Sequence, residues 1–189
     1  MVLTEITTWF LEMRSPDQLK PGRAPRREVV LTRVGQPCPE FSRFFYRSVG
    51  GHWYWIDRIE WTYEQWRAWT EQVETWAAYV DGTPAGYFEL QDRRVGEGSV
   101  NIALFGLLPW AIGQGIGGWL LTRAIERAWE LGPRIVTVNT CSVDGPHALA
   151  NYQARGFTIA RIYTGSRDLP DQPPGPWRTS RQRAEGSGS

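Results

Sequence analysis

Residues 100–121 read VNIALFGLLPWAIGQGIGGWLL, and this stretch decides how the rest of the chain is organised. A β-like run from 100 to 108 leads through a proline into a glycine-rich turn, and a helix opens at about Gly117. Gly113, Gly115 and Gly117 permit a tight bend that exposes backbone N–H groups. Together with the positive end of the helix dipole, those donors predict a site for phosphate or pyrophosphate.

The composition indicates which classes of partner and which cellular compartment to expect. A length of 189 residues predicts one domain, and 21 basic against 20 acidic residues create no strong field for nucleic acid or a membrane surface. Two distant cysteines, no secretory signal and no long apolar run favour a reducing, cytoplasmic location. Two histidines and two cysteines at these spacings match no zinc pattern, so no metal is expected. Small molecules or proteins are therefore the expected partners.

The order of strand and helix patterns predicts a mixed sheet of the α/β (α+β) class with about four flanking helices. Asp81-Gly82 is a strong hairpin signal within an antiparallel N-terminal meander. The helix between strands 100–108 and 134–139 requires those two strands to pair in parallel. The predicted strands are 5–13, 28–34, 75–80, 85–91, 100–108, 134–139 and 157–163, and the predicted helices are 40–49, 62–69, 117–130 and 148–155.

These elements place a single domain at 1–164, with 5–13 as an extra N-terminal strand. From residue 165 onward Pro, Gly, Ser and Arg dominate, which predicts a flexible tail over 165–189. The terminal GSGS is typical of an engineered addition rather than of a natural domain.

The glycine-rich loop is compatible with three kinds of phosphate site. A Walker loop requires a lysine that is absent here, which excludes NTP hydrolysis. A dinucleotide fingerprint requires G-x-G-x-x-G at a first βα turn and an acidic residue that ends the next strand. Here the spacing is G-x-G-x-G, an antiparallel meander precedes it, and the next strand ends in Asn139. The remaining option is a cradle for the pyrophosphate of an acyl-CoA.

Three motifs resemble the GNAT family of acyl-CoA N-acyltransferases: the strand end GLLP at 106–109, the loop IGQGIG at 112–117, and ANYQARGF at 150–157. The resemblance covers about 28–164, and it implies acetyl-CoA, or another acyl-CoA, bound in a splayed parallel strand pair. Ile112 stands where the family usually has Gln or Arg, so backbone N–H groups from Gln114 to Gly117 would hold the pyrophosphate. The implied cofactor contacts are Leu107, Leu108, Ile112, Gly113, Gln114, Gly115, Ile116, Gly117, Gly118 and Asn151.

The resemblance also implies catalytic roles. Tyr152 matches the family tyrosine that protonates the departing thiolate as general acid; the alternative is a tyrosine that only packs in a helix. Many relatives carry a glutamate on the strand at 100–108, where this chain has Asn101. Glu89 on the neighbouring strand is therefore the candidate base, and a solvent-facing carboxylate is the alternative. Asp57 and Asp144 are weaker base candidates.

Residues 41–69 correspond to the segment with which the family builds its acceptor pocket. Their aromatic side chains suit an amine on a flat, apolar or cationic body, with an acidic residue to meet a cation. Cys141 lies near the expected thioester, but a buried structural cysteine is its usual role. The expected acceptor-binding residues are Tyr46, His52, Trp53, Trp55 and Asp57.

These observations predict an N-acetyltransferase that moves an acetyl group from acetyl-CoA to a primary amine of a small molecule, by direct attack in a ternary complex. Two alternatives stay open: a non-catalytic acyl-CoA-binding or sensing module, and a protein or peptide N-acetyltransferase. The substitutions Ile112 and Asn101 favour the non-catalytic module, whereas the bulky loop at 50–61 argues against the open groove that a protein substrate needs. A homodimer through exposed tryptophans or the N-terminal strand is conceivable.

Overall fold

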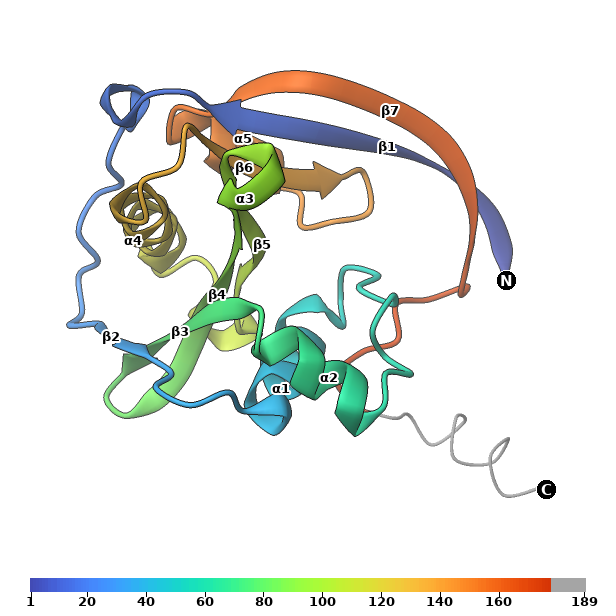
Figure 1. Ribbon diagram of the computed structural model, residues 1–189. Coiled ribbons are helices and arrows are strands. Elements are labelled where there is room, and N and C mark those ends of the chain that lie inside the picture. Colours follow the sequence, from blue (N-terminus) through green and yellow to red (C-terminus); the bar gives the residue numbers. More distant parts are fainter. Residues whose placement is uncertain (178–189) are drawn as a thin grey trace.

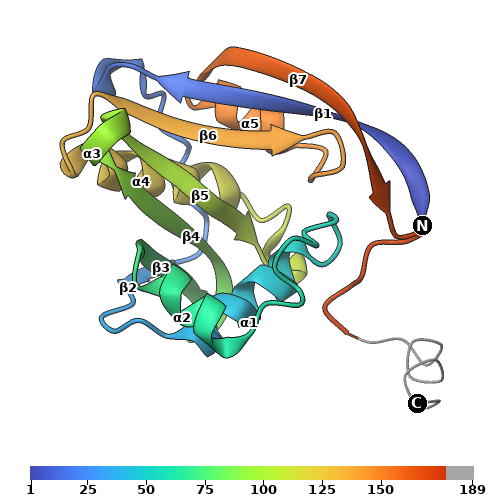
Figure 2. The same cartoon turned by 45° about the vertical axis from the view of Figure 1, so that its right-hand side comes forward.

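The computed structural model describes residues 1–177 as a twisted seven-stranded sheet with helices on both faces (Figures 1 and 2). The strand order is β2-β3-β4-β5-β6-β1-β7. The strands are β1 (Val2–Met13), β2 (Val30–Arg33), β3 (Val73–Val80), β4 (Thr83–Arg93), β5 (Ser99–Leu107), β6 (Ile135–Cys141) and β7 (Thr158–Leu169). The helices are α1 (Pro39–Gly50), α2 (Tyr63–Thr70), α3 (Arg94–Glu97), α4 (Ile116–Glu130) and α5 (Ala148–Ala154).

The predicted class and the predicted strands and helices are confirmed, with differences at their ends. The segment expected to be only a turn, 93–99, contains the single turn α3, which non-helical backbone angles interrupt at Val95 and Gly96. Strand β7 continues to Leu169 rather than ending at Tyr163, so the first residues of the predicted flexible tail belong to a strand. The terminal GSGS lies outside the described residues.

Two local signals produce the structures that they predict. Asp81 and Gly82 have φ angles of 48° and 75°, the left-handed pair that a tight hairpin turn between β3 and β4 requires. At the start of α2, Thr62 Oγ1 accepts from the Gln65 N–H at 3.4 Å, and Gln65 Oε1 accepts from the Thr62 N–H at 2.8 Å. This reciprocal cap fixes the start of the helix that carries Trp69 toward the sheet.

Strands β5 and β6 form the predicted splayed pair. Their parallel pairing runs from Ser99 opposite Ile135 to Ile102 opposite Val138 and stops there. Beyond that point β5 continues to Leu107 along β4, while β6 continues to Cys141 along β1. A gap therefore opens in the middle of the sheet, at the carboxyl ends of both strands.

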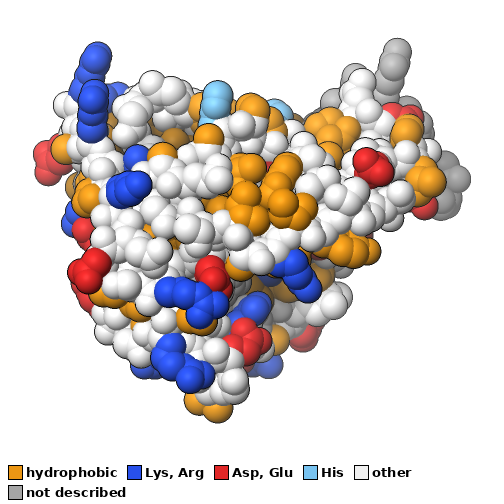
Figure 3. All heavy atoms as spheres, turned by 90° about the horizontal axis from the view of Figure 1, so that it is seen from above, with side chains coloured by type: hydrophobic (Ala, Val, Ile, Leu, Met, Phe, Trp, Pro, Cys, Tyr) orange, Lys and Arg blue, Asp and Glu red, His pale blue; other side chains and the backbone are white. Residues whose placement is uncertain are grey.

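Strand β1 lies between β6 and β7 and is antiparallel to both (Figure 1). Its second half pairs with β6 up to Thr8 opposite Cys141, whereas its first half pairs only with β7. The two strands thus form an arm that projects past the end of β6. Figure 3 views this side of the molecule: acidic and basic side chains are scattered over it, and hydrophobic side chains gather near its middle. The exposed apolar residues of the two strands include Val2, Leu3, Ile159, Ile162 and Tyr163.

The two faces of the sheet pack against different helices. On β4, Phe88 and Leu90 face α4 and α5, while Tyr87 and Glu89 face α1 and α2. This is the alternation that period-2 strand geometry predicts. A side chain at Gly106 of β5 would overlap Val49, so glycine lets α1 cross the sheet closely.

Candidate active site

The glycine-rich loop ends at the N-terminus of α4. Gly113 and Gly115 have φ angles of 81° and 79°, in the left-handed region that glycine adopts without strain. Gly115 is the N-cap, so the first N–H groups of α4 have no acceptor within the helix. The Gln114 N–H differs from the expectation, because it donates to the carbonyl of Ala111 at 3.4 Å. The Ile112 side chain is 49% exposed beside this loop.

Helix α5 and the residue that caps its C-terminus bring two further polar side chains to the same place. Gly118, in the first turn of α4, has no side chain, and a methyl group there would overlap the Arg155 guanidinium and lie 3.7 Å from Asn151 Oδ1. The Nε atom of Arg155 is buried and has no hydrogen-bond partner within residues 1–177. Sequence reasoning missed Arg155, although it stands inside the motif ANYQARGF.

The backbone groups of Leu107 and Leu108, both expected to contact the cofactor, differ in whether they are free to do so. The Leu108 N–H donates to the Ala85 carbonyl at 2.8 Å, and the Leu108 carbonyl accepts from the Ala111 N–H at 2.9 Å. Both of its backbone groups are therefore engaged. Backbone groups of successive strand residues point to opposite sides, so those of Leu107 face the gap beyond the last β5–β6 pair.

Tyr152 on α5 packs beside the gap. Its ring contacts Phe105 of β5 and Phe157 edge-on, with centroid separations of 6.1 and 6.2 Å. The side chain is 4% exposed, and burial, assisted by the charge of Asp144, raises the pKa of the phenol. Tyr152 therefore keeps its proton at neutral pH.

Glu89 is wholly buried under α1 and α2, so its interpretation as a solvent-facing carboxylate is wrong. Its Oε1 accepts from Ser42 Oγ at 2.5 Å and Thr75 Oγ1 at 3.3 Å, and its Oε2 accepts from Trp69 Nε1 at 2.5 Å. Burial raises the pKa of this carboxyl against the lowering effect of these donors and of Arg58. The carboxylate reaches three elements of the scaffold and lies outside the lining of the cavity described next.

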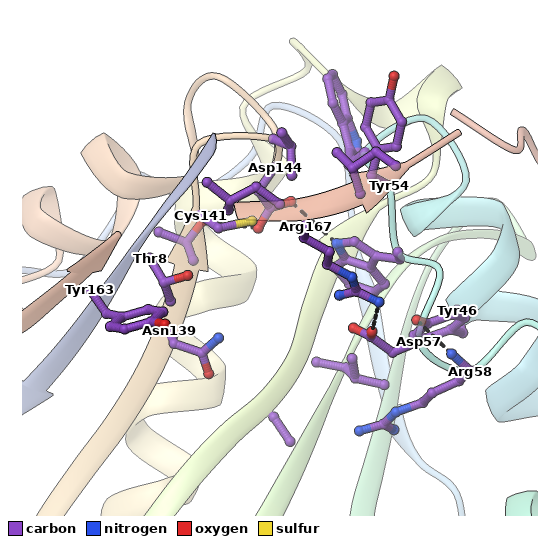
Figure 4. Close-up of a pocket in the computed structure, with 18 of the residues that line it drawn as sticks. Thr8, Tyr46, Tyr54, Asp57, Arg58, Asn139, Cys141, Asp144, Tyr163 and Arg167 are labelled. Carbon is purple, nitrogen blue, oxygen red and sulfur yellow. Dashed lines mark hydrogen bonds and ion pairs between the residues drawn. The ribbon is translucent and has the colours of Figure 1, made fainter. Parts of the chain in front are cut away.

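A cavity of about 700 Å³ opens on the face of the sheet that carries α1 and α2 (Figure 4). The loop after α1, the ends of β5 and β6, and the arm formed by β1 and β7 enclose it. Of the expected acceptor residues, His52 is exposed and is not part of this lining. The others, Tyr46, Trp53, Trp55 and Asp57, line it together with Arg58, Asn101, Asn139, Cys141, Asp144, Tyr163 and Arg167.

Polar contacts tie the walls of the cavity together. Arg167 of β7 donates to Asp57 at 2.6 Å, which joins the arm to the loop after α1 (Figure 4). Asp144 accepts from Trp55 Nε1 at 3.3 Å, Thr140 Oγ1 at 2.9 Å and the Gly145 N–H at 2.9 Å. The loop after α1 and the loop after β6 therefore share one carboxylate.

Two residues bear on the acyl-transfer chemistry expected at this cavity. Burial raises the pKa of the Cys141 thiol, which keeps it protonated and disfavours its action as a nucleophile. Asn101 faces the cavity from β5, where its Oδ1 accepts from Thr137 Oγ1 at 3.1 Å. An amide thus occupies the strand position at which the resemblance led us to expect an acid.

A family model described as the acetyltransferase (GNAT) family matches residues 39–157, more than half of the chain. The chain therefore belongs to the GNAT family of acetyltransferases, whose members use acetyl-CoA. A search of curated proteins found no match.

Solved structures show the same fold. A GCN5-related N-acetyltransferase from Kribbella flavida is 18% identical with a TM-score of 0.61, over 89% of this chain and 60% of that one. One from Sphaerobacter thermophilus is 19% identical with a TM-score of 0.60, over 86% and 51%. A tandem GNAT protein from the clavulanic acid biosynthesis pathway is 16% identical with a TM-score of 0.56, over 89% and 55%. The chain thus spans about half to three-fifths of the length of these structures.

None of the helices within residues 1–177 has the length and apolar character needed to cross a membrane. No cluster of three or more His, Cys, Asp or Glu side chains in that part of the chain is arranged to hold a metal ion.

Proposed function

We propose that this chain transfers an acetyl group from acetyl-CoA to a primary amine of a small molecule, by direct attack within a ternary complex. The observation that carries the proposal is the gap between β5 and β6. It has the glycine-rich N-terminus of α4 on one side of the sheet and the 700 Å³ cavity on the other. A cavity of this size suits a small-molecule acceptor.

The residues present fit acetyl-CoA. The unengaged N–H groups at the start of α4, with Gly113 and Gly115 bending the loop, suit the pyrophosphate. Arg155 and Asn151 adjoin that turn and add a positive charge and an amide, which compensates for Ile112 in place of a polar residue. The backbone of Leu107 faces the gap and suits the amides of the pantetheine arm. Bound there, the thioester supplies an activated acetyl group.

Protein residues would then donate one proton to the leaving thiolate and accept one proton from the amine. Tyr152 keeps its phenolic proton beside the gap and can donate it to the thiolate that leaves when the new C–N bond replaces the C–S bond. Glu89 is closed off from the cavity, so we assign the acceptor side to Asp144. Asp144 lines the cavity, its charge acts on Tyr152, and its three donors leave one of about four acceptor positions for the amine.

The test is thiol release from acetyl-CoA across a panel of small primary amines, with CoA binding measured separately by calorimetry. Acetyl-CoA-dependent release with at least one amine supports the enzyme. Tight CoA binding without release for any amine would support the alternative of a non-catalytic acyl-CoA-binding module, which Asn101 and Ile112 favour. A peptide panel in the same assay tests protein acetylation, against which the loop after α1 in the cavity wall argues.

Replacing Gly115 by alanine is expected to weaken CoA binding about tenfold, because the N-cap would leave its left-handed conformation and misdirect the N–H groups behind it. Gly132→Ala is the matched control. Gly132 follows the other end of α4, has a φ of 74° and, like Gly115, has no atom within 4 Å of an added methyl group. Both variants should lose similar stability, but only Gly115→Ala should change the calorimetric affinity. Equal affinities would remove the loop from the cofactor site.

A further inference from the structure

The charged side chains of the cavity differ in how they are paired. Asp57 and Arg167 bind each other at 2.6 Å, and Asp144 accepts three hydrogen bonds. Arg93 donates twice to Gln91 Oε1, at 2.9 and 2.7 Å. Arg58 is different, because its Nη1 atom is buried and has no hydrogen-bond partner within residues 1–177.

Aromatic rings hold the Arg58 side chain in place. Its Cζ lies 3.6 Å from the ring centroid of Trp69 and 4.6 Å from that of Trp61, and Tyr46 is 5.8 Å away. Its backbone N–H donates to the Tyr46 hydroxyl at 3.2 Å (Figure 4). Such stacking fixes the plane of the guanidinium. Among its nitrogens Nη1 is the one buried without a partner within residues 1–177, so the N–H groups of Nε and Nη2 are those that can reach a planar acceptor in the cavity.

The charge of Arg58 is only partly compensated. The charge of Glu89 stabilises the guanidinium, but burial has the larger effect and lowers the Arg58 pKa. Both carboxylate oxygens of Glu89 accept hydrogen bonds, from Ser42, Thr75 and Trp69. Among residues 1–177, no ion pair within 4 Å joins Glu89 to Arg58. An arginine placed in a cavity wall, partly desolvated and without a direct acceptor, favours an incoming anion.

We propose that Arg58 binds a carboxylate of the acceptor, so that the acceptor is an amino acid or a close derivative of one. The proposal rests on the proposed function, whose amine it completes. The aromatic walls, with Trp53, Trp55 and Tyr163, then hold the apolar side chain of the amino acid, whose α-amine lies beside the carboxylate at Arg58. Asp57, which we expected to meet a cationic acceptor, is already neutralised by Arg167.

The first experiment compares amino acids with the amines that lack only the carboxylate. The pairs are phenylalanine with phenethylamine, tryptophan with tryptamine, and leucine with 3-methylbutylamine, each titrated calorimetrically into the full chain in the presence of CoA. A charge-assisted bond predicts that at least one amino acid binds ten- to hundredfold more tightly than its amine. Equal or tighter binding of the amine in every pair, or no binding in any pair, overturns the proposal.

The second experiment tests the residue. Arg58→Lys keeps the charge without the planar fork, and Arg58→Met keeps the apolar stem; both should reduce the preference for the amino acid to less than about threefold. The amine affinity should stay within about twofold, which a collapsed cavity would not allow. Arg67→Gln on α2 is the control for net charge and should keep the preference, because Arg67 is exposed and, among residues 1–177, pairs only with Glu71, at 3.8 Å. A preference that survives in both Arg58 variants overturns the assignment.

The two experiments distinguish a failure of carboxylate binding at Arg58 from a failure of acetyl transfer. If simple amines release thiol and the Arg58 variants behave as wild type, the proposed function holds and the carboxylate proposal is wrong. If amino acids bind through Arg58 and no thiol is released, the carboxylate site stands and the enzyme proposal is wrong.

Discussion

Tyr152→Phe is expected to lower kcat by about 10²–10⁴-fold while the KM for acetyl-CoA changes little. The substitution removes only the hydroxyl group, and the ring contacts with Phe105 and Phe157 remain. Because burial raises the pKa of Tyr152, the phenol is protonated throughout the neutral range and is ready to donate. Steady-state thiol release with a saturating amine measures the effect.

Tyr87→Phe is the matched control for Tyr152→Phe. Tyr87 is also fully buried and also has a raised pKa, but its hydroxyl has no partner within residues 1–177 and lies under α1 rather than at the gap. Its variant should keep kcat. If Tyr152→Phe retains wild-type kcat, or if both variants lose it equally, the acid role of Tyr152 is wrong.

Glu89→Ala is expected to lower the free energy of unfolding by about 3–5 kcal/mol, because each buried donor left without its acceptor costs about 1–3 kcal/mol. Ser42 on α1, Trp69 on α2 and Thr75 on β3 would each keep a buried donor without its acceptor. Arg58 would also lose the charge that stabilises it most. Chemical denaturation followed by circular dichroism measures the loss, and Glu64→Ala on the exposed side of α2 is the control. A loss below about 1 kcal/mol would contradict this scaffold role.

The same carboxyl predicts how stability changes with pH. The native pKa of Glu89 is raised, so as the pH rises above about 4.3 the unfolded chain releases this proton first. The native state then holds more protons, and the contribution of Glu89 to the unfolding free energy falls as pH rises from that value through the native pKa. Below both pKa values the contribution is complete. Denaturation series from pH 4 upward should show this decline relative to Glu89→Gln, and parallel curves would contradict it.

The sequence predicted the elements well because their signals are local. Asp81-Gly82 needs only its own backbone angles, and the cap between Thr62 and Gln65 spans three residues. The splay of the parallel strand pair followed from the resemblance to a family rather than from local pattern, and the pairing, which stops at Ile102, confirms it. The continuation of β7 to Leu169 was missed, because only pairing with β1 makes a strand of that polar segment.

The side chains of the site were harder to predict, since their environments come from distant segments. Glu89 alternates with Phe88 and Leu90 as expected, but the sequence does not show that α1 and α2 cover it completely. Arg58 was not predicted as a site residue, because its lack of a hydrogen-bond partner within residues 1–177 is visible only in three dimensions. Asp144 gained importance for the same reason, because Trp55 reaches it from 89 residues away.

The position of β1 has a consequence for how the chain acquires its structure. Among the seven strands of the described sheet, β1 comes earliest in the sequence and pairs only with β6 and β7, and its partner residues lie more than 120 positions later. Contacts of such separation close slowly, because the chain entropy must be lost before any pairing compensates for it. Residues 2–13 therefore remain unpaired and partly apolar while the β2–β5 meander forms, and the arm beside the cavity forms last.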